Sequence, residues 1–200
     1  LQSGSDTVLR LMHRRYDTRF FARKTEEVRK HIPDAFIGVD VIVGMRGETD
    51  KLFGESLAFM RSLPVSQYHV FSYSERPGTK ALGIPGKVPP DVRHERSRQV
   101  LALSDEKLRT YYNMYKGQTR PVLLEKPAPD PSLRGKGKRS ILHGFTDNYI
   151  RTEVTEQLDN HTVGHLDNTI VRVRLGEWNE KGDALKGSLS HNETGETVKW

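Results

Sequence analysis

Hydrophobic residues recur every three to four positions in four segments of the front part of the chain, which is the spacing of one helix face. Three of these segments follow a capping residue: Ser5 or Asp6, Asp17 with Thr18, and Thr49 or Asp50. The fourth segment, residues 91–116, is followed by Gly117. The predicted buried positions are Val8, Leu9, Leu11 and Met12; Phe21, Thr25, Val28 and Ile32; Leu52, Phe53, Leu57, Met60 and Leu63; and Val100, Leu103, Leu108, Tyr111 and Tyr115.

Two runs rich in β-branched and aromatic residues, 35–44 and 67–73, separate these helices and predict strands of a parallel sheet. One face of the first strand is apolar and suits packing under helices: Ile37, Val39, Val41 and Val43. Its other face is small or polar and leaves room for a ligand: Gly38, Asp40, Ile42 and Gly44. The chain then turns through 44–48. We expect one wall of a ligand site there, because α/β sheets bind ligands outside the carboxyl ends of their strands.

After residue 118 the pattern changes to short β-rich runs separated by polar turns. The runs are 121–126, 141–145, 148–155, 170–175, 184–189 and 196–200. Short strands at even spacing predict a small antiparallel β-barrel. The sequence thus predicts an α/β domain over residues 1–118 and an all-β domain over residues 119–200.

The α/β domain is incomplete in this interpretation. It has two full strands and the stub of a third at Leu1-Gln2, and such a sheet can neither close a barrel nor bury both of its faces. We therefore expect residues 1–118 to be the C-terminal part of a larger α/β barrel. The chain would then be cut from something longer, with most of the catalytic residues upstream.

Composition narrows the chemistry. The chain has no cysteine, which excludes disulfides, thiolate metal ligands and thiol nucleophiles from these 200 residues. His161 and His165 are interpreted as part of a surface turn, so no metal site is predicted. No apolar run approaches the roughly 18 residues that cross a bilayer, and no membrane partner is expected. The net charge of +6 favours a polyanionic partner.

A basic, glycine-containing loop followed by aromatic residues predicts a nucleic-acid surface in the second domain. The cations of the loop are Arg134, Lys136, Lys138 and Arg139. Cations suit phosphates, and the rings of Phe145 and Tyr149 suit stacking on bases. Arg151, Arg172 and Arg174 extend this surface if they share a barrel face. A hairpin loop without a binding role is the alternative interpretation.

Several blocks of the sequence resemble the radical S-adenosylmethionine methylthiotransferases, in the order in which that family carries them. The blocks are Leu1 to Asp6 with Met12 and Arg14-Arg15-Tyr16, Asp40 to Thr49, His69 to Thr79, and Gly144 to Arg151. The last block is similar to the start of the family's TRAM domain, an RNA-binding β-barrel. The resemblance is greatest to the branch that modifies N6-threonylcarbamoyladenosine. Residues 145–149 lack the Arg-Thr-x-x-Asn-Arg pattern that the isopentenyladenosine branch tends to carry.

The resemblance implies a cytoplasmic, tRNA-modifying transferase that adds a methylthio group to C2 of that nucleoside, beside the anticodon. It implies S-adenosylmethionine and two [4Fe-4S] clusters as cofactors of the full-length enzyme. The partners it implies are the anticodon stem-loop of tRNA and an electron donor for the clusters. The cluster cysteines must then lie upstream. This chain alone should bind no cluster, supply no catalytic residue and be inactive.

The resemblance also implies site residues. Those expected to contact S-adenosylmethionine are Gln2, Ser3, Asp40, Ile42, Gly44, Glu48, Val70 and Phe71. Those expected to contact RNA or substrate are Arg46, Arg76, Arg134, Lys136, Lys138, Arg139, Phe145, Asn148, Tyr149 and Arg151. Met45-Arg46 stands where many members have Phe-Pro, which should loosen the turn and add a cation at the substrate mouth.

Two other functions stay open on the sequence. One is a non-catalytic RNA-binding module whose front helices serve as a scaffold. The other is a methylthiotransferase that acts on a ribosomal protein. Cluster cysteines upstream of Leu1 would distinguish the enzyme from the binding module. Salt-dependent binding of stem-loop RNA would distinguish a tRNA substrate from a protein substrate.

Overall fold

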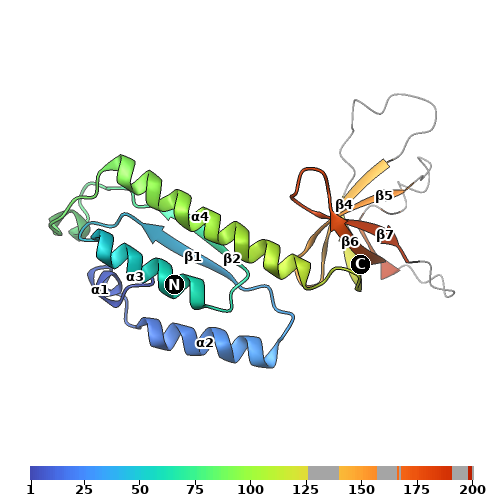
Figure 1. The fold of residues 1–200 in the computed structure, drawn as a ribbon, viewed down its shortest axis with the longest axis horizontal. Helices are drawn as coiled ribbons and strands as arrows, with labels where there is room; N and C mark the ends of the chain where they lie inside the picture. Colours follow the sequence, from blue (N-terminus) through green and yellow to red (C-terminus); the bar gives the residue numbers. More distant parts are fainter. Residues whose placement is uncertain (126–139, 157–165, 167, 191–197, 200) are drawn as a thin grey trace. The chain divides into compact units, whose positions relative to one another are not determined.

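A computed structural model of the protein describes residues 1–125, 140–156, 166, 168–190 and 198–199 (Figure 1). The chain divides into two compact units, Leu1–Tyr111 and Tyr112–Trp200. The predicted loop cations Arg134, Lys136, Lys138 and Arg139 lie outside the described residues, as do His161 and His165. No helix of the described part is both long and apolar enough to cross a membrane.

The first unit contains a short parallel sheet. Strand β1 (Gly38–Val43) pairs in parallel with β2 (Gln67–Ser72), and Gln2 forms a parallel bridge to Val41 at the other edge of β1. The N–H of Gln2 donates to the carbonyl of Asp40 (2.9 Å), and the N–H of Ile42 donates to the carbonyl of Gln2 (2.8 Å). The predicted strand stub at Leu1-Gln2 therefore joins the sheet. The larger barrel to which it would belong stays a prediction.

Helices connect and cover these strands (Figure 1). They are α1 (Asp6–Leu11), α2 (Thr18–His31), α3 (Asp50–Ser62), the 3-10 turn η1 (Lys80–Gly83) and α4 (Pro90–Asn113), whose last residues belong to the second unit. Two predicted caps are confirmed, because Asp17 accepts from the N–H of Phe20 and Thr49 accepts from the N–H of Leu52. Ser5 precedes α1 without a side-chain capping bond.

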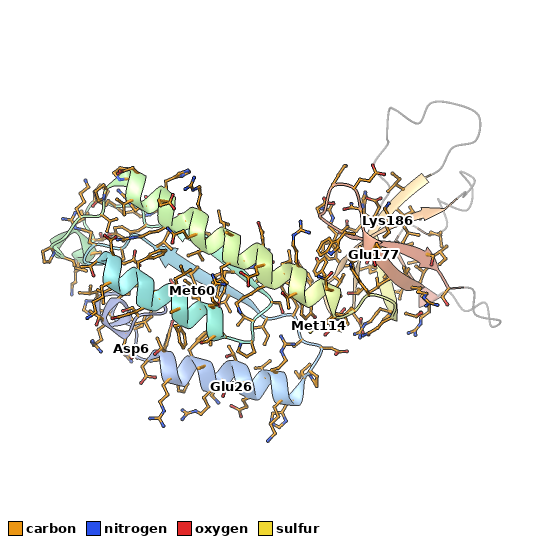
Figure 2. All side chains as sticks on the ribbon, in the orientation of Figure 1. Asp6, Glu26, Met60, Met114, Glu177 and Lys186 are labelled. Atoms are coloured by element: carbon orange, nitrogen blue, oxygen red, sulfur yellow. The ribbon has the colours of Figure 1, made fainter. Side chains whose placement is uncertain are left out.

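The predicted alternation of β1 is confirmed up to Val43, but Gly44, predicted on the face with room for a ligand, is buried against Arg93. Val39, Val41 and Val43 are buried in one core cluster with side chains from α3, β2 and α4, while Gly38 and Asp40 on the opposite face are exposed. The cluster also contains Met60, which lies between α3 and the strands in Figure 2, together with Leu1, Phe53, Leu63, Val65, Tyr68, Val100 and Leu103. Within the described residues, β1 thus has one covered face and one open face.

The predicted buried stripe of α2 is wrong in its second half. Thr25 is buried and Phe21 packs against the core, but Val28 and Ile32 are 41% and 58% exposed. Arg29, not Ile32, makes the contacts at the end of this helix. Its guanidinium donates to the carbonyls of Pro33 (2.6 Å), Ala35 (2.8 Å) and Pro64 (3.2 Å). These bonds satisfy carbonyls around the end of the helix, and the contacting face shifts away from Val28 and Ile32.

The second unit is a small β-barrel. Its strands are β3 (Thr119–Leu124), β4 (Ser140–Thr146), β5 (Arg151–Glu156), β6 (Thr169–Trp178), β7 (Leu185–Leu189) and β8 (Val198–Lys199). They run in the order β3-β4-β5-β7-β6-β8, and a further pairing of β3 with β6 closes five of them into a ring. The interior consists of nearly inaccessible side chains: Val122, Leu124, Leu142, Ile150, Thr152, Val154, Val173, Leu175, Ala184 and Leu185.

The prediction that all neighbours in this barrel are antiparallel is wrong at one pair, since β5 and β7 are parallel. The other four pairings of the ring are antiparallel. An odd number of strands cannot alternate in direction all the way around a closed ring. A five-stranded barrel therefore needs at least one parallel pair, and here β7 supplies it by lying between β5 and β6.

Alanine substitutions at two glycines should move stability in opposite directions. A Cβ on Gly187 would lie 2.4 Å from Val173 Cγ1 and 2.8 Å from Thr152 Cγ2, whereas a Cβ on Gly54 in α3 meets nothing within 4 Å. We expect Gly187→Ala to destabilise the barrel by about 1–3 kcal/mol through overpacking. We expect Gly54→Ala to stabilise the first unit by about 0.5–1 kcal/mol, because alanine is the better helix former.

Urea unfolding measures both effects. The two tryptophans, Trp178 and Trp200, belong to the second unit, so their fluorescence reports the barrel, and far-UV circular dichroism reports the helices. Equal stability of the Gly187→Ala and wild-type barrels would contradict the close packing at residue 187.

Candidate functional site

The turn that follows β1 is held at several points. Gly44 and Gly47 have φ of +75° and +83°, which few residues other than glycine adopt. The N–H of Glu48 donates to the carbonyl of Met45 (3.0 Å), and the N–H of Gly47 donates to the carbonyl of Gly86 (2.8 Å). The replacement of Phe-Pro by Met45-Arg46 therefore does not leave the turn loose, because backbone bonds and the Gly86 loop fix it.

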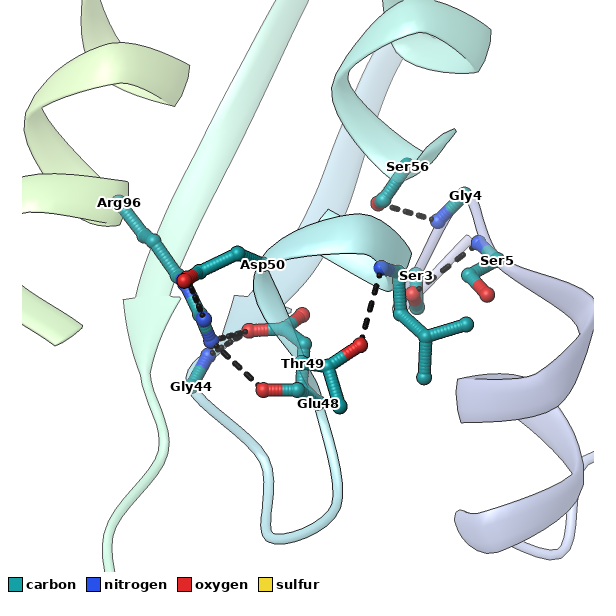
Figure 3. Close-up of polar contacts among 10 residues, drawn as sticks. Ser3, Gly4, Ser5, Gly44, Glu48, Thr49, Asp50, Ser56 and Arg96 are labelled. Carbon is teal, nitrogen blue, oxygen red and sulfur yellow. Dashed lines mark hydrogen bonds and ion pairs between the residues drawn. The ribbon is translucent and has the colours of Figure 1, made fainter. Parts of the chain in front are cut away.

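A buried ion pair fastens this turn to α4. The carboxylate of Glu48 is 1% exposed and accepts from the N–H of Gly44 (2.7 Å) and from Arg96 Nη1 (2.8 Å) (Figure 3). Arg96, itself 5% exposed, also donates to the carbonyl of Glu48 (3.0 Å) and to Asp50 (2.7 Å). Burial raises the pKa of the Glu48 carboxyl above its ordinary value, and the Gly44 N–H and Arg96 oppose that rise. Glu48 is thus engaged with the turn itself and with α4.

A second arginine of α4 fills the space beside Gly44. A Cβ on Gly44 would lie 2.0 Å from Arg93 Cγ, so that side chain occupies the position. Arg93 Nη1 donates to the carbonyl of Tyr73 (2.6 Å), just beyond β2. The positive φ and the Arg93 stem both require glycine at residue 44, independently of any ligand.

Arg46, expected at the substrate mouth, is already paired. Its guanidinium donates to the carboxylate of Glu75 (2.8 Å) and to the carbonyl of Ile84 (2.7 Å). Lys87 reaches the same carboxylate at 3.2 Å, and hydrogen bonds from Lys87 and Arg46 lower the pKa of Glu75. In the structure Arg46 joins the turn to the loop that follows β2. Arg76 is exposed in that loop.

The loop after the strand stub lies against α3. The N–H of Gly4 donates to Ser56 Oγ (2.8 Å), and a Cβ on Gly4 would lie 2.5 Å from the carbonyl oxygen of Ser56. Ser3 is buried and accepts from the N–H of Ser5 (3.2 Å) (Figure 3). Gln2 is half-buried beside Asp40 and Ile42, to which its backbone is bonded. The structure thus brings the first expected cofactor residues next to the second block, about forty positions away.

On the open face of the sheet, three residues predicted to contact the cofactor lie in two register pairs between β1 and β2. Asp40 pairs with His69 and Ile42 pairs with Phe71. Asp40 and His69 are exposed, Ile42 is half-buried, and Phe71 is 54% exposed. Val70 packs instead against the core on the other face, so only its backbone is available there. A charged end and an apolar end therefore lie side by side at the edge of the Gly44 turn.

On the barrel, two of the expected RNA-contacting rings lie together. Phe145 and Tyr149 stack with centroids 5.0 Å apart, and Tyr149 is 58% exposed with φ +66°. The turn between them is fixed from inside, because Thr146 Oγ1 donates to Asn148 Oδ1 (2.6 Å) and accepts from the N–H of Ile150 (2.8 Å). Asn148 was expected to contact RNA, but its side chain is 6% exposed and supports the turn from inside. Tyr149, next to it in the turn, is the residue whose side chain is exposed.

Among the described residues, some arginines of the barrel form an ion pair and others do not. Arg151 donates to Asp183 (2.9 Å) and follows the aromatic turn directly. Arg172 and Arg174 are both exposed and alternate with buried Val173, which confirms that they share one side of β6. Leu123 of β3 is 43% exposed and is the register partner of Phe145 on β4 and of Ile170 on β6. Arg172 lies two positions along β6 from Ile170, so a cation is close to these apolar residues.

Sequence reasoning missed the two arginines that hold the turn, Arg93 and Arg96. The helical pattern of residues 91–116 marks its apolar seam and leaves arginines to the surface. Glu48 and Arg96 are 48 positions apart. The one available signal was the carboxylate of Glu48 in an otherwise buried turn, since a buried carboxylate needs a partner. Among the described residues, no group of three or more His, Cys, Asp or Glu side chains is placed to hold a metal ion.

Removing the partner of Glu48 should produce a pH-dependent loss of stability. Arg96→Met leaves a buried carboxylate unpaired and should cost about 3–5 kcal/mol at neutral pH. Its pKa then rises further above the unfolded value, so the folded state holds the extra proton. Stability is therefore retained below the unfolded pKa and is lost as pH rises through the raised folded pKa. Urea unfolding followed by circular dichroism from pH 4 to pH 8 measures the slope.

The matched control is Glu48→Gln/Arg96→Met, which has no carboxyl to titrate at residue 48. This double variant should lose the added slope and recover part of the neutral-pH stability. An Arg96→Met loss that is the same at every pH would contradict a buried Glu48–Arg96 pair.

Known proteins resemble the chain over most of its length, although no protein-family model matches it. The threonylcarbamoyladenosine tRNA methylthiotransferase MtaB of Bacillus subtilis is 34% identical over 151 residues, 76% of this chain and 32% of that protein. The tRNA-2-methylthio-N(6)-dimethylallyladenosine synthase of Thermobifida fusca is 38% identical over 177 residues, 88% of the chain and 33% of that protein. The synthase of the same name from Bacillus pumilus is 35% identical over 195 residues, 96% and 36% respectively.

The chain thus spans about a third of the length of the curated relatives it matches. A match over 195 residues takes in both units. The blocks that suggested the family are therefore supported by similarity along the whole chain. It belongs to the radical S-adenosylmethionine methylthiotransferase family.

Proposed function

We propose that the chain is part of a tRNA-modifying transferase that adds a methylthio group to C2 of N6-threonylcarbamoyladenosine, next to the anticodon. In this proposal residues 1–118 supply part of the S-adenosylmethionine wall as the end of a radical SAM barrel. Residues 119–200 supply a TRAM-like RNA-binding barrel. The observation that carries the proposal is the open strand face at the edge of the Gly44 turn. The names of the relatives support the reaction class.

The donor set on the open face fits S-adenosylmethionine. Ile42 and Phe71 are register partners and offer apolar surface to the flat adenine ring. Asp40, beside them on the same face, is exposed and accepts hydrogen bonds from ribose hydroxyls or pairs with the ammonium group. Gln2 and Ser3 lie next to Asp40 along the neighbouring strand stub. When bound, the cofactor supplies the methyl group and the reactive carbon chemistry of the family.

The chain's own residues would bind and position. The Glu48–Arg96 pair and the Arg46–Glu75 pair hold the turn and the loop after β2, so the wall is formed before the ligand arrives. Phe71 and Ile42 exclude water from one side of the adenine. A phosphate or carboxylate contact by Arg46 has to compete with Glu75, which makes Arg46 a weaker candidate than its place at the mouth of the site suggests.

The iron-sulfur chemistry would come from outside these residues. The sequence contains no cysteine, so ligands for [4Fe-4S] clusters have to be supplied upstream. The electron donor would act on those clusters, in the cytoplasm where tRNA is modified. We accordingly expect the 200-residue chain to bind RNA but not to catalyse the methylthio transfer.

A second candidate substrate is N6-dimethylallyladenosine. The Thermobifida fusca synthase named for that nucleoside is 38% identical over 88% of the chain, against 34% over 76% for the threonylcarbamoyladenosine enzyme. The sequence of residues 145–149 favours the threonylcarbamoyl branch, and overall identity favours the dimethylallyl branch. A non-catalytic RNA-binding module and an enzyme for a ribosomal protein find no support in the names of these relatives.

Nucleoside analysis of tRNA tests the function and decides between the substrates. Cells that lack the gene should lose 2-methylthio-N6-threonylcarbamoyladenosine and accumulate the unmethylthiolated nucleoside, as measured by liquid chromatography and mass spectrometry. Loss of 2-methylthio-N6-dimethylallyladenosine instead assigns the second substrate. Unchanged amounts of both would contradict the proposed function. Complementation with the intact gene is the control.

The aromatic turn of the barrel should contribute directly to RNA affinity. Tyr149→Ala removes a 58% exposed ring that stacks on Phe145. Stacking of a base on an aromatic ring contributes about 1–3 kcal/mol, so binding of an anticodon stem-loop should weaken by about 5- to 150-fold. Fluorescence anisotropy with a labelled stem-loop measures the change.

Two controls accompany this variant. Tyr149→Phe keeps the ring and should bind like wild type. Leu101→Ala shortens another exposed apolar side chain, 48% exposed on α4, and should also leave affinity unchanged. Equal affinity of Tyr149→Ala and Tyr149→Phe would remove the ring from the RNA-binding surface.

A further inference from the structure

A strongly basic stretch of the described residues lies in the first unit, outside the barrel. Residues 10–24 contain six Lys or Arg and a single acidic residue, Asp17. Five of the cations are exposed arginines between the last turn of α1 and the first half of α2. We call them the arginine collar: Arg10, Arg14, Arg15, Arg19 and Arg23.

The collar lies at the end of the sheet where the turn lies. The hydroxyl of Tyr16 donates to the carbonyl of Leu1 (2.8 Å), and the N–H of Thr18 donates to the carboxylate of Asp6 (2.8 Å). A Cβ on Gly47 would lie 2.8 Å from Leu11 Cδ1, so the end of α1 touches the turn after β1. The segment that carries the arginines is thus fixed to the carboxyl ends of the strands.

The fold does not require these charges. Among the described residues, Arg14, Arg15, Arg19 and Arg23 take part in no ion pair. Glu27 on α2 pairs with Lys24 (2.8 Å). Arg19 lies in the first turn of α2, which holds no acidic residue, and the positive end of a helix dipole disfavours a cation there. Exposed arginines that have no ion pair within the described fold and follow one another along one segment offer a surface for an anion.

Phe20 indicates what kind of anion fits. Phe20 directly follows Arg19 in the first turn of α2 and is 42% exposed. The guanidinium carbon of Arg23 lies 5.6 Å from the centroid of the Phe20 ring. An exposed ring with arginines around it offers a stacking surface together with phosphate contacts, a combination typical of surfaces that bind RNA.

We propose that the arginine collar binds the phosphate backbone of tRNA and presents the modified adenosine to the open face of the sheet. This inference rests on the proposed function and adds to it a second RNA-binding surface, separate from the barrel. The collar contacts phosphates and so positions the RNA without reading its sequence. Its contribution is therefore electrostatic and depends on salt.

The salt dependence of stem-loop binding by the 200-residue chain tests the proposal. The collar variant is Arg14→Gln/Arg15→Gln. The matched control is Lys30→Gln/Arg61→Gln, which removes the same charge from the last turns of α2 and α3. The slope of log K against log salt is negative, and each lost phosphate contact makes it shallower by about 0.7–0.9. We expect the slope of the collar variant to be shallower than that of the wild type by about 1.4–1.8, and that of the control by less than about 0.5.

Further measurements separate the possible failures. Arg14→Lys/Arg15→Lys keeps the charges and should retain most of the salt dependence. Thermal melting should find all variants folded, because the substituted side chains are exposed. Wild-type binding together with equal slopes for the collar and control variants would overturn the collar while leaving the proposed function intact. Absence of stem-loop binding by the wild-type chain at low salt would count against the proposed function itself. Preferential capture by anionic lipid vesicles over the stem-loop would overturn the collar as an RNA-binding surface.

Discussion

The buried pair of Glu48 and Arg96 is the interaction on which the geometry of the first unit depends. Each charge alone would be expensive to bury, so the two have to arrive together. Glu48 holds the N–H of Gly44 at the end of β1, and Arg96 holds the carboxylate from α4 while its guanidinium lies 5.2 Å from the ring of Phe53 on α3. Three elements are thereby fixed around one turn. The positive φ of Gly44 and the packing of Arg93 against it follow from that arrangement.

Local patterns in the sequence predicted most of the elements, because their causes are local. The capping residues Asp17 and Thr49 and the alternation of Val39, Val41 and Val43 act within a few positions of themselves. The strand stub at Leu1-Gln2 could be predicted for the same reason. The partner of Glu48 could not, since it depends on how α4 returns across the sheet. The misplaced face of α2 has a similar cause, because Arg29 bonds to carbonyls that only the folded chain brings near.

The barrel shows a constraint of a different kind. Its strands were predicted from composition and spacing, but their directions follow from closure, which no strand carries in its own sequence. Once five strands form a ring, one parallel pair is unavoidable, and β5 with β7 fills that role. Side-chain placement on the barrel is likewise split. The exposed alternation of Arg172 and Arg174 is local, whereas the ion pair of Arg151 with Asp183 joins residues 32 positions apart.

The open face of β1 and β2 is best understood through what could cover it. A parallel sheet is normally covered on both faces, and here the covered face is uniformly apolar. A second layer of packed helices would need the same kind of surface. The open face instead places Asp40 and His69 beside Ile42 and Phe71, which suits neither a helix nor water alone. A ligand with a flat apolar ring and a charged, hydroxylated remainder matches that division. The mixed character of the face therefore favours a nucleoside-containing cofactor over further packing.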